Sequence, residues 1–487
     1  MPIYCDILEV KKIIQGGVMK FNFVIEKNSD DTIYIQLYTA LKKMIDDEEI
    51  KPREKLPSIR QLAMKYDLSK LTVLKAYDLL EKNNLIYKIH GKGCFVKEKT
   101  SLYEKMQKPI INNFAIINKN INFASSTPCS DLYPIEQFRE IINSILLKDG
   151  EKLFNYSDTQ GCVKLRELIV KMLKKKGIKE TAQNIQIVTG AQQALDILNK
   201  IMLKNEHPAM AVGAPTYYGA INTFSDVAAM VPIPVCKDGF DLEALEHILQ
   251  NKKIDYLYAM INFESPTGIV WSQEKKKHLL ELAEKYDFLI IEDDCISDLY
   301  YYDNPTTPLK SLDKHERVIY INSFSKVIMP GLRLGYMVIP EKYITEVIAA
   351  KFSSDISSSG LMQMAAYHFI NEGHFEKHLE NLKKIYKERY EFTLKCLEKI
   401  KGIEIFTLAG GGFYFWIKLP DNINSNLVYA ILRDMKISIL PGTVFYIDKN
   451  AKSDYIRLSF ASAPVNEIKK GVDKLHEVIL SLQRIGE

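Results

Sequence analysis

The chain has 487 residues, which is too long for one ordinary domain and sets an expectation of about two to four units. Hydrophobic residues make up 47% and charged residues 26%, which excludes disordered, collagen-like and low-complexity proteins. No apolar run approaches the roughly 18 residues of a membrane helix, and the N-terminus lacks the pattern of a secretory signal. We therefore expect a cytoplasmic protein without a membrane partner.

The spacing of the cysteines and histidines and the distribution of charge further limit the class of protein. Seven scattered cysteines include no C-x-x-C pair and nine histidines show no metal-ligand spacing, so we expect a reducing compartment and no bound metal. Residues 41–100 hold 14 Lys/Arg and 9 Asp/Glu, a net charge of +5, so the rest of the +4 chain sums to −1. A polyanion is expected to bind near the N-terminal end.

Residues 1–30 precede the first clear pattern and are treated as an N-terminal extension. The stretch QGGV at 15–18 could be a translated ribosome-binding sequence, which would make Met19 the true start instead of Met1. Sequencing of the protein's N-terminus would decide between the two.

Three short helices are predicted within residues 31–98. Apolar residues recur at near-helical spacing between 33 and 49, which indicates the first helix. Pro57 stops a helix from running through, and Ser58 with Gln61 forms a capping box that opens the second. Ser69 caps the third helix. Its apolar face consists of Val73, Ala76, Tyr77 and Leu80.

Two strands follow, at 85–89 and 94–96, around a turn whose glycines can take positive φ. Three helices and a hairpin make a winged helix-turn-helix, whose third helix is shaped for a major groove. Residues 70–97 carry six lysines against Asp78 and Glu81. A solvated helical face is the alternative to DNA binding.

The segments 56–63 (LPSIRQLA), 69–73 (SKLTV) and 91–96 (GKGCFV) resemble the GntR-type DNA-binding domain in order and spacing. The resemblance implies a double-stranded DNA operator as partner. The contacting residues would be Arg60, Lys70, Thr72, Lys75, Gly91 and Lys92. Two positions depart from the pattern, because Arg53 replaces a glycine and Lys70 replaces an arginine. A lysine cannot bind guanine in a bidentate manner, so base readout at Lys70 would be weaker or different.

Residues 99–120 are polar and lysine-rich without a clear period, which predicts a linker. From 121 to 485 short apolar strands alternate with amphipathic helices, which predicts an α/β fold with a parallel or mostly parallel sheet. The candidate strands are 185–188, 209–212, 256–260, 288–291, 318–321 and 335–339. Ligands gather at the carboxyl ends of such strands.

Three segments that hold candidate binding or reactive groups directly follow candidate strands. Residues 189–195 (TGAQQAL) place backbone N–H groups at a helix N-terminus, an anion site, although a glycine there is also common for steric reasons. Residues 292–294 (EDD) offer a carboxylate for a cationic ring nitrogen, or only a cap. Residues 322–336 contain Lys326 and, seven positions later, Arg333, an amine for a Schiff base and a guanidinium for a phosphate.

Together these segments resemble the fold-type-I aminotransferase pattern, which binds pyridoxal 5′-phosphate (PLP), over roughly residues 121–485. The resemblance implies a mostly parallel sheet with large and small subdomains. Lys326 would form the Schiff base with PLP, and Asp293 would hold the pyridine nitrogen protonated. Tyr217 would stack on the ring, with Tyr218 as the alternative.

The resemblance also implies contacts to the phosphate and to a substrate. The phosphate would be bound by Ala191, Gln192, Ser323 and Arg333, and by Tyr156 from a partner subunit. Arg457 matches the arginine that receives a substrate or effector carboxylate. This arrangement implies a homodimer, domain-swapped and head-to-tail.

Two positions break the aminotransferase pattern. Ser265 stands where the family commonly has an asparagine, and Cys295 where it often has a tyrosine. Both missing groups normally hydrogen-bond the cofactor, so their loss weakens the case for efficient transamination. Cys295 could be a reactive thiol or an inert packed residue. The glycines at 410–412 lack the ending of a phosphate loop and predict a turn into a strand.

A GntR-type winged helix joined to an aminotransferase-like domain resembles the MocR subfamily of bacterial transcriptional regulators. This implies a DNA-binding regulator that uses PLP, or its aldimine with an amine or amino acid, as the effector. Two alternatives stay open: an aminotransferase with weak or partial activity, and a winged-helix scaffold with an empty cofactor fold.

Overall fold

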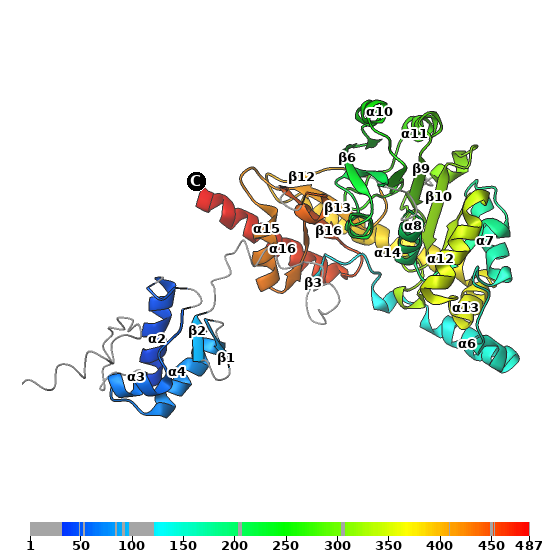
Figure 1. The fold of residues 1–487 in the computed structure, drawn as a ribbon. Coiled ribbons are helices and arrows are strands. Elements are labelled where there is room, and N and C mark those ends of the chain that lie inside the picture. The colour runs from blue at the N-terminus through cyan, green and yellow to red at the C-terminus, as the bar shows by residue number, and fades with distance from the viewer. Residues whose placement is uncertain are drawn as a thin grey trace, which may run out of the picture. The chain divides into compact units, whose positions relative to one another are not determined.

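The computed structural model describes residues 32–47, 49–51, 54–82, 85–89, 93–96, 121–202, 207–302, 307–408, 410–448, 451 and 453–486. The chain divides into two compact units, residues 1–108 and 109–487, which are considered separately (Figure 1). The alternative starts Met1 and Met19, the linker, and the wing residues Gly91 and Lys92 lie outside the described residues.

The N-terminal unit contains the three predicted helices and the hairpin. They are α2 (Ile33–Asp46), α3 (Ile59–Lys65), α4 (Lys70–Lys82), β1 (Ile86–Ile89) and β2 (Gly93–Val96). The capping box is confirmed, because Ser58 N donates to Gln61 Oε1 at 2.8 Å and Gln61 N to Ser58 Oγ at 3.2 Å. The predicted apolar face of α4 is fully buried and packs with Leu37 and Leu41 of α2. The first helix ends at Asp46, three residues early, and the chain turns so that Ile50 N donates to Met44 O.

The larger unit is built around an eight-stranded sheet of order β4-β11-β10-β9-β8-β5-β6-β7. The strands are β4 (Ile185–Val188), β5 (Ala209–Ala214), β6 (Ala229–Cys236), β7 (Gly239–Phe240), β8 (Tyr256–Ala259), β9 (Leu289–Asp293), β10 (Val318–Ser323) and β11 (Gly335–Val338). All six predicted strands are present. Neighbouring pairs from β10 through β6 are parallel, whereas β11 runs antiparallel to both its neighbours and β7 to β6.

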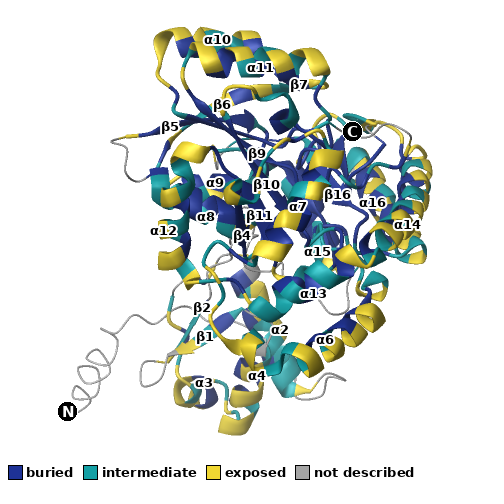
Figure 2. Ribbon diagram, turned by 90° about the vertical axis from the view of Figure 1, so that its right-hand side faces the viewer, coloured by how far each residue is buried: buried dark blue, intermediate teal, exposed yellow. Residues whose placement is uncertain are grey.

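Both faces of this sheet are covered, which explains its continuous apolar strands. Ala211, Leu257 and Ile290 face one cluster that includes the buried residues of α10 (Leu242–Asn251) and α11 (Gln273–Lys285). The alternate residues Tyr258 and Ile291 face the other cluster, with α8 (Ala191–Met202) and α9 (Tyr218–Phe224). Figure 2 shows the buried strands between these two helix pairs.

Further helices surround the large sheet and a smaller subdomain. These are α6 (Ile135–Asp149), α7 (Val163–Lys175), α12 (Ile344–Asp355), α13 (Gly360–Asn371), α14 (His374–Leu397), α15 (Ser425–Asp434) and α16 (Val465–Gly486). The smaller subdomain has an antiparallel sheet of order β12 (Glu404–Ile405), β13 (Tyr414–Lys418), β16 (Tyr455–Ser459) and β15 (Leu440–Pro441). The glycines at 410–412 precede β13, where the sequence predicts a turn into a strand, and Gly410 and Gly412 adopt positive φ there. No helix of the described ranges has the length and apolarity to span a membrane.

The reversed strand β11 brings three loops to one edge of the sheet. Its register aligns Gly335 with Ser323 at the end of β10 and with Val188 at the end of β4. A Cβ on Gly335 would lie 2.7 Å from Asn322 O and 3.2 Å from Gly190 Cα, so this close approach requires glycine. The segments that follow β4, β9 and β10 therefore meet at this edge.

Candidate functional site

A cavity of about 310 Å³ lies at this edge of the sheet, at the low end of the size of small-molecule sites. Seven of the cofactor-binding residues predicted from the sequence line this cavity. These are Ala191, Gln192, Tyr217, Asp293, Ser323, Lys326 and Arg333. The cavity is also lined by Ser126, Tyr218, Ser265, Cys295 and Tyr414.

The amine of Lys326 lines the cavity and donates a hydrogen bond to the carbonyl of Ser126 at 2.9 Å. Ser126 is held there because β3 (Ile121–Asn122) pairs with β14 (Ile437–Ser438) of the smaller subdomain. Burial lowers the pKa of Lys326 to about 8, and the charge of Arg457 lowers it in the same direction. A larger share of this amine is therefore neutral and nucleophilic near pH 7 than in an exposed lysine.

Asp293 is the last residue of β9, and its carboxylate is buried. Its Oδ2 accepts a hydrogen bond from Tyr258 OH at 3.0 Å, whereas its Oδ1 has no hydrogen-bond partner in the described part of the chain. Burial raises the pKa of Asp293, and the neighbouring Cys295 and the hydrogen bond from Tyr258 oppose that rise. A cationic group in the cavity would satisfy the unpartnered oxygen and stabilise the carboxylate.

The anion site at the start of α8 is completed by Arg333. Gly190 has φ of 89°, and a Cβ there would lie 3.1 Å from Arg333 Nη2. Arg333 Nη2 donates to Thr189 O at 2.7 Å, which keeps the guanidinium beside the helix N-terminus. Gln192 Nε2 donates to Thr223 Oγ1 at 2.7 Å. A positive side chain at a helix N-terminus suits a phosphate.

Aromatic and sulfur groups form another part of the cavity. The rings of Tyr217 and Tyr218 are 5.1 Å apart, and Tyr218 also contacts Phe445. Burial raises the pKa of Tyr217, and the nearby Tyr218 and Asp293 raise it further. Burial also raises the pKa of the Cys295 thiol well above its usual value. Cys295 is therefore protonated near pH 7, which favours the inert alternative.

Arg457 does not line the cavity but lies behind its wall. Its Nη1 donates to Ser265 Oγ at 3.1 Å, its Nη2 donates to Ala124 O, and its Nε is buried without a hydrogen-bond partner among the described residues. The guanidinium also stacks over the ring of Tyr414 at 4.6 Å. Ser265 thus binds the arginine that the sequence assigned to a carboxylate.

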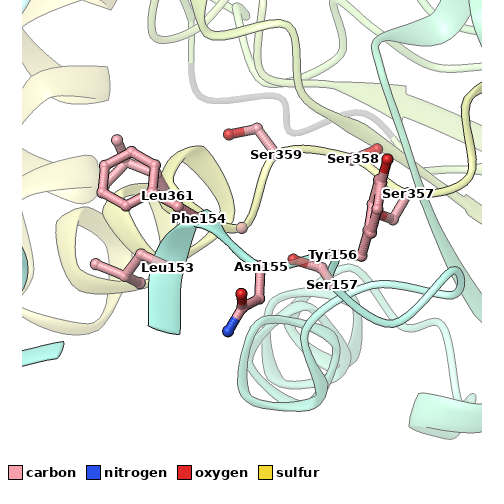
Figure 3. Close-up of a pocket in the computed structure, with 10 residues that line it drawn as sticks. Leu153, Phe154, Asn155, Tyr156, Ser157, Ser357, Ser358, Ser359 and Leu361 are labelled. Atoms are coloured by element: carbon pink, nitrogen blue, oxygen red, sulfur yellow. The ribbon is translucent and has the colours of Figure 1, made fainter. Parts of the chain in front are cut away.

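Within one chain, Tyr156 does not line the cavity that holds Lys326. Its side chain is 83% exposed and lines a second pocket, between residues 153–157 and 357–361 (Figure 3). An exposed tyrosine in this position is accessible to a second subunit. Its contact with the phosphate of a partner stays a prediction.

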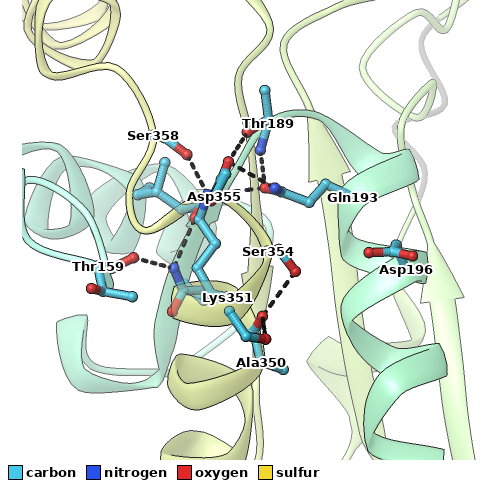
Figure 4. Close-up of polar contacts among 12 residues, drawn as sticks. Thr159, Thr189, Gln193, Asp196, Ala350, Lys351, Ser354, Asp355 and Ser358 are labelled. Carbon is cyan, nitrogen blue, oxygen red and sulfur yellow. Dashed lines mark hydrogen bonds and ion pairs between the residues drawn. The ribbon is translucent and has the colours of Figure 1, made fainter.

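A polar network that the sequence did not reveal ties the anion site to α12 (Figure 4). The fully buried ammonium of Lys351 donates to Asp355 Oδ1 at 2.5 Å, to Gln193 Oε1 at 3.0 Å and to Ser358 Oγ at 3.0 Å. Asp355 Oδ2 accepts from Thr189 Oγ1 at 2.9 Å and from Gln193 Nε2 at 2.8 Å. These hydrogen bonds hold the first turn of α8 against the end of α12.

In the N-terminal unit, the predicted DNA-contacting residues lie on α3 and α4. Arg60, Lys70 and Lys75 are exposed, and Thr72 is half-buried. Ser69 caps α4, because its Oγ accepts from Thr72 N at 3.1 Å and lies 2.8 Å from Thr72 Oγ1. The cap holds the helix N-terminus beside Lys70, so its positive end and the lysine can face the same phosphate.

Comparison with known proteins assigns both units. Residues 118–475 match the family "Aminotransferase class I and II", and residues 33–96 match "Bacterial regulatory proteins, gntR family". Aromatic-amino-acid aminotransferase 1 of Thermococcus litoralis is 30% identical over 368 residues, 74% of this chain and 88% of that protein. The uncharacterized HTH-type transcriptional regulator YdfD of Bacillus subtilis is 29% identical over 471 residues, 92% of this chain and 96% of that protein.

Among solved structures, kynurenine aminotransferase of Pyrococcus horikoshii, in complex with PMP, matches with a TM-score of 0.70 and 34% identity. The match covers 74% of this chain and 91% of that one. The regulator from Bacillus subtilis, by contrast, matches across both units. The chain belongs to the aminotransferase class I and II family, carries a GntR-type DNA-binding domain, and is a PLP-dependent transcriptional regulator of the MocR type.

Proposed function

We propose that the cavity around Lys326 senses PLP, or an amine or amino acid that reacts with it, and that this signal changes DNA binding by the winged helix. One observation carries the proposal: an amine, a buried carboxylate oxygen without a partner and a helix N-terminus with an arginine all line one cavity. Bound PLP supplies an aldehyde that captures amines and a ring that withdraws electrons.

In this proposal each group of the cavity has a distinct role. Lys326 attaches the cofactor covalently, and Asp293 Oδ1 accepts a hydrogen bond from the ring nitrogen. Ala191, Gln192, Ser323 and Arg333 hold the phosphate, and Tyr217 covers the ring. The support is their common position in the cavity.

The effector's chemistry is tied to Arg457. To bind a carboxylate, this guanidinium would exchange its bond to Ala124 O or to Ser265 Oγ for one to the ligand. An amino acid would therefore alter the wall of the cavity, whereas an amine without a carboxylate would leave both contacts in place. This difference gives the site a means to distinguish the two ligand classes.

We further infer a head-to-tail, domain-swapped homodimer that acts in the cytoplasm, where its DNA lies. Large apolar side chains remain exposed on the segments that form the Tyr156 pocket or directly precede them, as expected of a surface that a second copy covers. Phe154 lines that pocket, and Phe352 and Ile356 come shortly before its second segment, residues 357–361. Ligand binding would shift the dimer between arrangements that hold the two winged helices at different separations.

The first test follows the absorbance spectrum of the PLP-loaded protein during titration with a panel of amino acids and amines. For a sensor, we expect one ligand to change the spectrum without complete conversion to the pyridoxamine form, and the same ligand to change operator affinity. Complete conversion that an oxo acid reverses would instead establish an aminotransferase. Equal operator affinity for apo, PLP-bound and ligand-treated protein would refute the sensing role.

Replacing Lys70 by alanine is expected to weaken DNA binding and to reduce the slope of log affinity against log salt by about one. The reason is that an exposed lysine beside the capped start of α4 is placed to neutralise one phosphate. Fluorescence anisotropy over a range of salt concentrations measures the slope. Lys277→Ala, an exposed lysine of α11, serves as the control and should leave it unchanged. An unchanged slope in Lys70→Ala would remove Lys70 from the interface.

A further inference from the structure

The exposed face of α4 carries two leucines that do not belong to the hydrophobic core. Leu71 is 60% exposed and Leu74 is 36% exposed, while Val73, Ala76, Tyr77 and Leu80 of the same helix are fully buried. Leu71 and Leu74 are three positions apart and are therefore neighbours on the helix surface. The apolar core of this unit is complete without them.

Positive charge surrounds these leucines. Lys70 and Lys75 are exposed on the same helix, and Arg60 is exposed on α3. The acidic residues of α4 are partly neutralised, because Lys88 Nζ lies 2.7 Å from Asp78 Oδ1 and 2.7 Å from Glu81 Oε2. An apolar pair within a basic surface matches a polyanion that also presents apolar groups.

We propose that Leu71, with Leu74 beside it, contacts the 5-methyl groups of thymine in the major groove and so sets part of the operator sequence. Thymine is the base that presents a methyl group in this groove. Leu71 lies between Lys70 and Thr72 near the start of α4, the part of a recognition helix that meets base edges. The proposal rests on DNA binding by this helix and adds a base preference to it.

The chemistry of Lys70 strengthens this reading. A lysine is a point charge and does not form the two parallel hydrogen bonds by which arginine identifies guanine. Thr72 is half-buried, and its hydroxyl is already 2.8 Å from Ser69 Oγ. Because Lys70 lacks the planar fork of arginine and the Thr72 hydroxyl already has a partner, the leucines are placed to add base discrimination on this face of α4.

The experiment selects duplexes from a random library with the full-length PLP-loaded protein, then replaces each thymine of the best duplex by deoxyuridine. This change removes one methyl group and keeps the base pair. At one or two positions we expect affinity to fall about fourfold, the fold-change that corresponds to ~0.8 kcal/mol for one buried methyl group. At the other thymines we expect less than about a twofold change.

Variants then assign the effect to the side chain. In Leu71→Ala the deoxyuridine effect should shrink to less than about twofold at a contacted position, while Leu71→Met should retain most of it because the side chain stays large and apolar. Met64→Ala is the matched control, because Met64 is 84% exposed on the preceding helix α3. It should leave the deoxyuridine effect unchanged. Since Leu71 is largely exposed, its variants should melt at the wild-type temperature.

Two results would overturn the inference while leaving DNA binding intact. One is specific binding that no deoxyuridine substitution weakens, and the other is a methyl effect that persists in both Leu71→Ala and Leu74→Ala. Either result would mean that the leucine pair does not read thymine methyl groups. Failure of the chain to select any duplex would instead contradict its role as a DNA-binding regulator.

Discussion

Apo-protein is expected to attach PLP covalently at a rate that rises with pH and is half-maximal near pH 8. Only the neutral amine is a nucleophile, and burial lowers the pKa of Lys326 to about 8. Because the pKa is lowered, about one amine in ten is neutral at pH 7, against roughly one in 2,500 for an ordinary lysine of pKa ≈ 10.4. Stopped-flow absorbance between pH 6 and pH 9.5 measures the rate.

Lys326→Ala should abolish this attachment completely. After borohydride reduction, wild-type protein should carry one stable cofactor adduct at Lys326 and the variant none, as read by mass spectrometry of the peptides. The chain's other lysines are the internal control, since an adduct spread over them would mean non-specific reaction. A rate that stays flat between pH 6 and pH 9.5, or that still rises about tenfold per pH unit at pH 9.5, would contradict the lowered pKa of Lys326.

The sequence located Lys326, Asp293 and Arg333 because each belongs to a short segment directly after a strand. Their meeting in one cavity follows from the strand order, since β4, β9 and β10 end at the same edge. Local patterns of this kind can be recognised in a single sequence without knowledge of the fold. The apolar face of α4 was predictable for the same reason, because its helical period is local.

Other parts of the site depend on contacts between distant segments. Ser126 is 200 positions from Lys326 and reaches it through the pairing of β3 with β14. Tyr258 appears in the sequence as one more apolar strand residue, although its hydroxyl binds Asp293 across β8 and β9. Leu71 cannot be recognised from the sequence, because an exposed leucine carries no signal until the burial of its neighbours is known.

Replacing Asp355 by alanine should lower the free energy of unfolding of the large unit by about 2 kcal/mol, within the range for a buried donor that loses its partner. The Lys351 side chain is fully buried, whereas the Asp355 side chain is 32% exposed, so the full loss of a buried ion pair is not expected. Lys351 would keep a buried ammonium with only Gln193 and Ser358 as partners. Urea unfolding followed by tryptophan fluorescence isolates this unit, because both tryptophans, Trp271 and Trp416, lie in it. The same variant should bind PLP more weakly, since Thr189 and Gln193 lose their acceptor.

A surface pair of the same spacing provides the control for Asp355→Ala. Asp196 and Lys200 of α8 are also four positions apart and lie 3.3 Å from each other, with side chains 51% and 38% exposed. Asp196→Ala should therefore change stability by less than about 1 kcal/mol. If the unpaired ammonium causes the loss, Lys351→Met combined with Asp355→Ala should be more stable than Asp355→Ala alone. Equal losses in both would instead assign the effect to the hydrogen bonds that Asp355 accepts from Thr189 and Gln193.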